Sequence, residues 1–132
     1  MPGSAYAQAV NDIRDVIAAY AQALDDGRTD DVVATFCPDA TVSLPGMDVI
    51  RGHEAIRVAY AAMTPRRPQR HVVANTVVSE VDDHAARATS DVLVLGRGEA
   101  GWAVRLVGRY TDDLRRLDTG WRFAARTLEF VE

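Results

Sequence analysis

The stretch HVVANTVVSEVDDHAARATSDVLVLG, residues 71–96, decides the fold of this chain. It is rich in β-branched apolar residues, and it is interrupted once, by the polar run 82–84, before it resumes. This pattern is typical of two long strands joined by a short turn. The stretch therefore predicts an antiparallel hairpin in the centre of a sheet.

Two ionisable residues, His71 and Asp91, interrupt the apolar faces of this hairpin. With a three-residue turn, residue 81 pairs with 85, 77 with 89 and 75 with 91. Side chains alternate along a strand with a period of two, so this register puts His71 and Asp91 on the same face. A two-residue turn would put them on opposite faces. In the first register, a histidine and a carboxylate that face inward from one sheet indicate a functional site.

The segments before the hairpin predict three helices. Residues 6–25 carry apolar side chains at steps of three and four, and Gly27 follows as a C-cap. Thr29 caps a short second helix, which has Phe36 on its apolar side and ends at Pro38. The third helix is expected from residue 52 to about 63.

Further strands are expected at 40–44, at 102 to about 114 and at 121–130, the last two joined by a turn at 118–120. Because the helices come first and the antiparallel strands follow, the fold class is α+β, with the helices packed on one face of a curved sheet.

The convex face carries Val72, Val78, Val92 and Val94 in the expected register and is partly apolar. A second copy that covers this face would bury it, so we expect a homo-oligomer, either a dimer or a trimer.

Composition excludes several classes of protein. The 132 residues suit one domain, 1–132, and the net charge of −4 argues against a nucleic-acid-binding surface. One cysteine, Cys37, excludes an internal disulfide, and no metal-ligand spacing surrounds it. No signal peptide or membrane span is recognisable, so we expect a cytoplasmic protein with no membrane partner.

A family resemblance rests on five motifs. The segments YAQALDDG (20–27), FCPDATV (36–42) and RGHEAI (51–56) resemble the opening of the SnoaL-like, NTF2-like α+β-barrel family, and GRY (108–110) with GWRF (120–123) resembles its last two strands. The resemblance implies a cone: three N-terminal helices close a strongly curved antiparallel sheet around a deep, mostly apolar pocket. The family includes isomerases, dehydratases, cyclases, hydrolases and binding modules, so the fold alone does not settle the function.

The pocket residues narrow the choice within the family. The position of the catalytic aspartate of the ketosteroid isomerases holds Leu44 here, and scytalone dehydratase has two pocket histidines where this chain offers one. The bile acid 7α-dehydratases have the most similar pattern, which is matched here by Tyr20, Asp25, His71, Asp91 and Arg126.

The resemblance implies a dehydratase-type lyase or an isomerase without metal or organic cofactor. His71 is expected to remove a proton next to a carbonyl, with Asp25 fixing its tautomer and Tyr20 donating to the carbonyl or the leaving hydroxyl. Arg126, positioned by Asp91, would bind an anionic or enolic oxygen. The substrate is expected to be small and apolar, either polycyclic and steroid-like or polyketide-like.

Each of these residues also has a structural interpretation. His71 can be a core histidine with both ring nitrogens bonded, Tyr20 can be core packing, and Asp91 with Arg126 can be a buried ion pair between strands. Asp25 is disfavoured by the dipole at a helix C-terminus and needs a compensating partner. A non-catalytic ligand-binding module and a polyketide cyclase remain as alternatives.

Overall fold

The computed structural model describes all 132 residues, which form three helices and six strands. In chain order these are α1 (Gly3–Asp25), α2 (Thr29–Ala34), β1 (Phe36–Ser43), β2 (Ile50–Arg51), α3 (Gly52–Ala62), β3 (Gln69–Ser79), β4 (Ala85–Gly98), β5 (Gly101–Leu117) and β6 (Gly120–Phe130). The predicted order of helices followed by long strands is confirmed.

The six strands form one sheet in the order β2-β1-β6-β5-β4-β3. Every neighbouring pair is antiparallel except β1 and β6, which run parallel. The expected α+β class with helices on a curved sheet is confirmed, and the parallel pair is a departure from a purely antiparallel sheet. It arises because β1, which precedes α3, joins the sheet beside the last strand.

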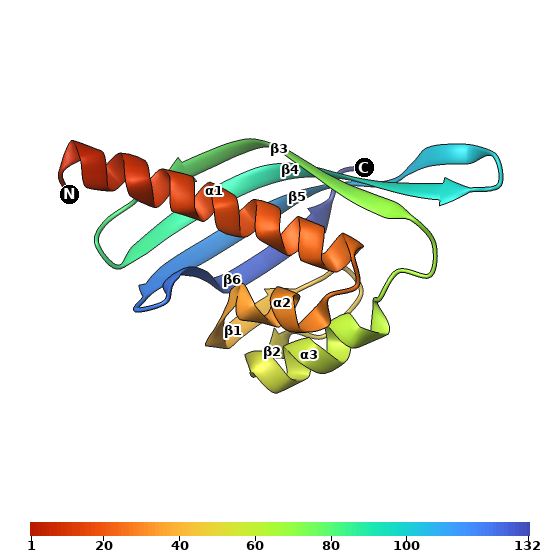
Figure 1. Cartoon of the computed structure of the whole chain (residues 1–132), viewed down its shortest axis with the longest axis horizontal. Helices are drawn as coiled ribbons and strands as arrows, with labels where there is room; N and C mark the ends of the chain where they lie inside the picture. The colour runs from red at the N-terminus through yellow and green to blue at the C-terminus, as the bar shows by residue number, and fades with distance from the viewer.

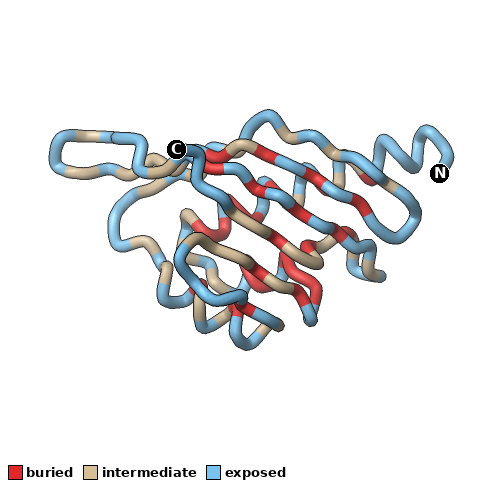
Figure 2. The backbone as a smooth tube through the Cα atoms, turned by 180° about the vertical axis from the view of Figure 1, so that it is seen from behind, coloured by how far each residue is buried: buried red, intermediate tan, exposed pale blue.

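The helices cover one face of the sheet and α1 lies along its length (Figure 1). The apolar stripe of α1 buries Ile13, Ile17, Tyr20 and Leu24 against the sheet. Burial of each such side chain contributes about 1.5–3 kcal/mol, so this stripe is enough to fix the helix on the sheet. Buried residues alternate with exposed ones along the central strands (Figure 2), as expected for a sheet with one covered face.

One boundary differs from the expectation. Phe36 and Cys37 lie in β1 and not at the end of the second helix, which stops at Ala34. Both residues are buried: Phe36 is 1% exposed and Cys37 is 0% exposed. Pro38 therefore lies inside an early strand, where it is exposed, and it does not act as the helix stop that the sequence suggested.

The register of the central hairpin follows the prediction near the turn and then departs from it. Val77 pairs with Thr89 as expected, but the register shifts between Ala74 and Val77. Asn75 adopts a left-handed conformation with φ of 55°, which is typical of a β-bulge. The bulge adds one residue to β3, so every side chain before it changes face relative to β4.

This shift separates His71 from Asp91. His71 pairs with Val94, whereas Asp91 pairs with Ala74, so the two ionisable side chains lie on opposite faces of the sheet. The prediction that they share a face is wrong. Of the four valines expected on the convex face, only Val72 is exposed there; Val92 is buried, and Val78 and Val94 pack against the core on the covered side.

The hairpin of β4 and β5 is longer than the rest of the sheet and projects beyond it (Figure 1). Its outer half, from Leu95 to Val104, pairs only with itself and with the first residues of β3. None of the helices is long and apolar enough to cross a membrane.

The bulge leads to a stability prediction. Asn75→Val is expected to lower the free energy of unfolding by about 1–2 kcal/mol, because a β-branched residue is strained at positive φ. Asn75→Gly should cost less, since glycine adopts this conformation freely. Urea denaturation of both variants measures the difference. A valine variant as stable as the glycine variant would contradict the assigned bulge.

Candidate active site

An apolar pocket opens between the helices and the covered face of the sheet. Its volume is about 290 Å³ and ten of its thirteen lining residues are hydrophobic. Tyr20, Tyr60 and Tyr110 line it and are each 2% exposed, so they form its floor. The mouth is formed by more exposed lining residues, Leu44, Pro45, Met63, Gln69, Val94, Leu106, Leu128 and Phe130.

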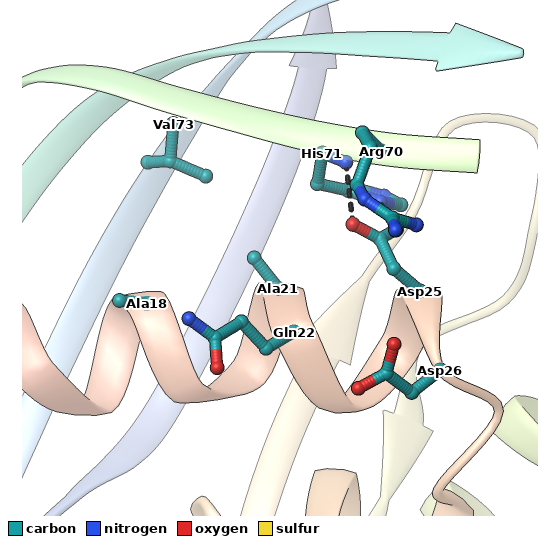
Figure 3. A pocket seen from close by; sticks show the side chains of 8 residues that line it. All are labelled: Ala18, Ala21, Gln22, Asp25, Asp26, Arg70, His71 and Val73. Atoms are coloured by element: carbon teal, nitrogen blue, oxygen red, sulfur yellow. Dashed lines mark hydrogen bonds and ion pairs between the residues drawn. The ribbon is translucent and has the colours of Figure 1, made fainter.

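Asp25 and His71 meet at the side of this pocket. Asp25 is the last residue of α1 and His71 is the third residue of β3, and Figure 3 shows the carboxylate pointing from the helix towards the strand. The Nδ1 atom of His71 lies 2.6 Å from Oδ1 of Asp25. Both side chains are largely buried, with 10% of His71 and 5% of Asp25 exposed. The fold therefore brings together two side chains that are 46 positions apart.

The contact fixes the tautomer of the imidazole. A carboxylate can only accept hydrogen bonds, so Nδ1 of His71 must donate and Nε2 of the neutral ring carries a lone pair. Nε2 makes no hydrogen bond within the chain, and it is not among the buried polar atoms left without a partner. Because His71 also lines the apolar pocket, Nε2 is available to a ligand there.

Asp25 has three hydrogen-bond donors, which offset its unfavourable position at a helix C-terminus. Oδ2 accepts the backbone N–H of His71 at 2.7 Å, and Oδ1 accepts both the imidazole and Nε2 of Gln69, the latter at 3.2 Å. All three donors come from the start of β3. The carboxylate thus joins the end of the helix to the edge strand and orients the imidazole between them.

The same pair can be reached from outside the pocket. A groove between α1 and β3, about 480 Å³ in volume, has Asp25 and His71 on its wall, together with the small side chains Ala18 and Ala21 (Figure 3). His71 therefore lies between the apolar pocket on one side and an open polar groove on the other. No cluster of three or more His, Cys, Asp and Glu side chains is placed to hold a metal ion.

Two tyrosine hydroxyls meet at the floor of the pocket. The hydroxyl oxygens of Tyr20 and Tyr60 are 2.6 Å apart. Burial raises the pKa of Tyr20 well above its usual range, and Tyr60 adds to the shift; burial also raises the pKa of Tyr60 and of Tyr110. The hydroxyls therefore stay protonated at neutral pH. Since one hydroxyl donates to the other, the second proton of the pair can be donated to a ligand.

Arg126 is buried behind this floor. Its guanidinium lies 3.4 Å from the ring centroid of Tyr110 and 4.3 Å from that of Tyr20, and its side chain has no exposed surface. It does not line the pocket. The structure therefore does not place Arg126 in direct contact with a pocket ligand, which corrects the predicted substrate-binding role.

The partner of Arg126 is Asp112 and not Asp91. Nε of Arg126 lies 3.0 Å from Oδ1 of Asp112, and both side chains are fully buried. Burial raises the pKa of Asp112 to about 6, and the adjacent guanidinium opposes this shift, so the carboxylate is ionised at pH 7. Nη1 of Arg126 has no hydrogen-bond partner and relies on the faces of the surrounding aromatic rings.

Asp91 lies on the outer face of the sheet, where it accepts hydrogen bonds from Nδ2 of Asn75 at 2.8 Å and from Arg109 at 2.7 Å. The hydrogen bond from Asn75, followed by that from Arg109, lowers the pKa of Asp91. The predicted role of Asp91 in the pocket is therefore wrong. Its neighbours Ser90 and Val92 face the covered side, so Asp91 faces outward, and the bulge at Asn75 turns only His71 to the covered side.

The sequence reasoning missed four residues of the site: Tyr60, Gln69, Tyr110 and Asp112. Asp112 could have been found from the alternation of β5, since it lies between Tyr110 and Leu114 on the buried face. Tyr60 follows the buried Ile56 by four positions on α3, which puts it on the same helical face. Nothing in the sequence singles out Gln69, whose role depends on where β3 begins.

Fold and pocket together define an α+β domain in which helices and a curved sheet surround an apolar cavity. The SnoaL-like domain model matches residues 5–127, so the chain belongs to this family. No curated protein matches the sequence.

Three solved structures illustrate the similarity. A protein of unknown function from Mycobacterium tuberculosis, Rv3472, has a TM-score of 0.92 at 26% identity, over 100% of this chain and 77% of that one. A protein from Catenulispora acidiphila, in complex with S-DNPA, has a TM-score of 0.84 at 27% identity, over 94% of both chains. A candidate scytalone dehydratase from Novosphingobium aromaticivorans has a TM-score of 0.83 at 23% identity, over 93% of this chain and 84% of that one, and shows the shared fold.

The buried ion pair gives a prediction about stability. Asp112→Asn is expected to lower the free energy of unfolding by about 3–5 kcal/mol, because it leaves the Arg126 cation buried without a counter-charge. The neighbouring Asp113→Asn is the matched control: Asp113 is about half exposed and pairs with Arg87 on the surface, where such pairs contribute at most about 1 kcal/mol. Chemical denaturation compares the two variants. Equal losses would contradict the assignment.

Proposed function

We propose that this protein is a cofactor-independent dehydratase or double-bond isomerase that acts on a small, apolar cyclic carbonyl compound. The observation that carries the proposal is the Asp25–His71 pair: Nδ1 of the imidazole is held by a buried carboxylate at 2.6 Å, Nε2 has no partner in the chain, and His71 lines an apolar pocket. A base that is oriented in this way, beside a mostly apolar cavity, suits proton abstraction from carbon.

His71 acts as the base in this scheme. Its Nε2 takes a proton from the carbon next to the carbonyl group, and the electron pair of the broken C–H bond moves into an enolate. Asp25 stabilises the imidazolium that forms by accepting the Nδ1 hydrogen bond. In a dehydration, the β-carbon–oxygen bond then breaks and the hydroxide leaves as water with the proton from His71, so the base is regenerated. In an isomerisation, the same proton returns to another carbon.

The tyrosine pair supplies the second function, stabilisation of the enolate oxygen. The hydroxyls of Tyr20 and Tyr60 lie at the floor of the pocket and share one hydrogen bond. The proton that this bond does not use is donated to the developing negative charge, where a preorganised donor in a dry site is most effective. Arg126, behind the rings, acts through Tyr20 and Tyr110 and not on the substrate itself.

The size of the pocket limits the substrate. A volume of about 290 Å³ lies at the lower end of the range for small-molecule sites, roughly 300–1,000 Å³. This favours a skeleton of one or two rings over the larger polycyclic and steroid-like compounds that the sequence pattern suggested. The tyrosine rings of the floor, which pack edge-to-face on one another, suit a flat ring that stacks or packs edge-on.

Two other functions use the same pocket. A polyketide cyclase would use the His71 base for an aldol-type ring closure. A ligand-binding module would enclose the same small molecule without turnover; the structure with S-DNPA is an instance of a related chain that holds a small ligand. The free Nε2 of His71 favours an enzyme, because a purely structural histidine would have both ring nitrogens bonded to the protein.

The test is proton exchange at carbon. With 1-tetralone in D₂O, the wild-type protein is expected to exchange the protons next to the carbonyl, measured by NMR. With 3-hydroxy-1-tetralone it should eliminate water and release 1-naphthol. His71→Ala should lower both rates by at least about 100-fold, the usual contribution of a positioned general base. Asp25→Asn should also lower them, because it favours the wrong imidazole tautomer.

His53→Ala is the matched control for these rates. Nε2 of His53 donates a hydrogen bond to the carbonyl oxygen of Phe36 at 2.7 Å, and His53 does not line the pocket. Its loss should therefore leave the rate of proton exchange unchanged. If the wild-type protein binds 1-tetralone but does not exchange its protons, the chain is a binding module. If His71→Ala exchanges these protons as fast as the wild-type protein, His71 is not the base.

We also propose that the outer face of the sheet joins two copies of the chain. An apolar row crosses this face from Val72 through Leu93 to Val107, and each of the three side chains is 38–44% exposed. The adjacent row, Asp91 and Arg109, carries both signs of charge. Contact with another copy of the chain would bury this row and remove its apolar surface from water.

Light scattering tests the assembly. The wild-type protein is expected to be a homo-oligomer, either a dimer or a trimer, at micromolar concentration, and Leu93→Arg should shift it to the monomer by placing a charge in the apolar row. Val58→Arg, on the exposed face of α3, is the control and should not change the mass, because Val58 is 64% exposed and lies on a helix away from this face. A wild-type monomer would contradict the proposal.

A further inference from the structure

The two segments beside the mouth of the pocket carry an excess of positive charge. Segment 66–70 and segment 97–105 together contain five arginines and one acidic residue, Glu99, in a chain whose net charge is −4. The segments adjoin, since the N–H of Arg97 donates to the carbonyl oxygen of Pro68 at 3.0 Å. None of the five arginines takes part in an ion pair, whereas arginines elsewhere form eight such contacts.

One of these arginines, Arg105, lies against the projecting hairpin of β4 and β5. It is the extra residue of a bulge, because Val94 pairs with Leu106 and Leu95 with Val104. Its side chain covers two glycines of β4. The position that a Cβ of Gly96 would take is 2.9 Å from Nε of Arg105, and the corresponding position at Gly98 is 3.2 Å from Nη2.

The register shows that Arg105 lies on the pocket side of the hairpin. Gly96 has the same face as Val94, two residues earlier, and pairs with Gln69 of β3. Both Val94 and Gln69 line the pocket mouth. The guanidinium of Arg105 therefore extends the pocket wall just outside its apolar part, and the missing side chains at Gly96 and Gly98 leave the space that it occupies.

We propose that Arg105 binds an anionic group, a carboxylate or a phosphate, of the ligand whose apolar body fills the pocket. This inference rests on the proposed function of the pocket and specifies the class of substrate: an apolar ring system with an acidic tail. A guanidinium presents paired donors that match the oxygens of such a group. The neighbouring unpaired arginines add a positive field that attracts an anion to the mouth.

The strand geometry sets the distance between the acidic tail and the reacting carbon. Gln69 is two residues before His71 on β3, and Gly96 is its partner on β4. Arg105 lies over Gly96. With a rise of about 3.3 Å per residue and a strand spacing of about 4.8 Å, the backbone of Gly96 is about 8 Å from that of His71. A one- or two-ring body with a short acidic side chain spans this distance, in agreement with the volume of the pocket.

Matched probes test the proposal. The acid 1-naphthylacetate and its methyl ester share the ring body and differ in charge, and 1-naphthyl phosphate with 1-naphthol forms a second pair. Dissociation constants are measured by NMR titration with the wild-type protein, Arg105→Gln and Arg116→Gln. Arg116 is the control because it is an exposed arginine without an ion pair near the other end of β5.

The wild-type protein is expected to bind at least one anionic probe more tightly than its neutral counterpart, and added salt should reduce this preference. Arg105→Gln should lower the affinity for the anionic probe about fivefold, the effect expected from loss of an exposed ion pair, and leave the affinity for the neutral probe unchanged. Arg116→Gln should alter neither. The pair with the larger preference identifies the group as carboxylate or phosphate.

Gly96→Ala distinguishes direct binding by the guanidinium of Arg105 from general attraction by positive charge. The new methyl group displaces the Arg105 side chain but leaves its charge. This variant should lower the affinity for the anionic probe and leave the affinity for the neutral one unchanged. Equal affinity for charged and neutral probes, no measurable binding of the anions at millimolar concentration, or a loss of both probes in Arg105→Gln would overturn the proposal. These titrations need no turnover, so a failure of the proposed catalysis would be seen separately in the exchange assay.

Discussion

The site depends on one carboxylate at the end of a helix. Asp25 accepts three hydrogen bonds from the first residues of β3, and two of them come from His71 itself, through the backbone N–H and through Nδ1. A negative charge at a helix C-terminus is unfavourable by itself. Because the donors of the edge strand offset this cost, the position of α1 and the orientation of the imidazole are coupled. A shift of either element would break the contacts of the other.

A second constraint lies deeper, where Arg126 and Asp112 form a fully buried ion pair and the guanidinium lies against the rings of Tyr20, Tyr110 and Phe123. Replacement of such a pair by apolar residues is often neutral for stability, so its retention suggests a role besides stability. Here the cation lies against the rings of Tyr20 and Tyr110, whose burial raises their pKa values. The positive charge opposes that shift for both tyrosines and so makes the hydroxyls better donors than burial alone would allow.

Much of this arrangement could be predicted from the sequence. The apolar stripe of residues 6–25 and the long alternating strands defined the α+β fold. The dehydratase pattern selected Tyr20 and His71, which line the pocket, and Asp25, which bonds His71. Asp91 was misplaced because it was expected to share a face with His71, whereas a single extra residue at Asn75 turns His71 to the covered face and leaves Asp91 on the outer one. No local pattern marks that bulge, since an asparagine within a strand is compatible with either register. Asp112 took the place of Asp91 beside Arg126: the alternation of β5 marks it as buried, and the pairing of β5 with β6 puts it opposite Arg126.

The most direct test of this account is the tautomer of His71, observed by ¹⁵N NMR of the imidazole at a pH where the ring is neutral, with the signal assigned through His71→Gln. The account predicts a proton on Nδ1 and a bare Nε2 in the wild-type protein, and a shift of this balance in Asp25→Asn. A wild-type ring protonated on Nε2 would contradict the account, because His71 would then have no lone pair to offer in the pocket.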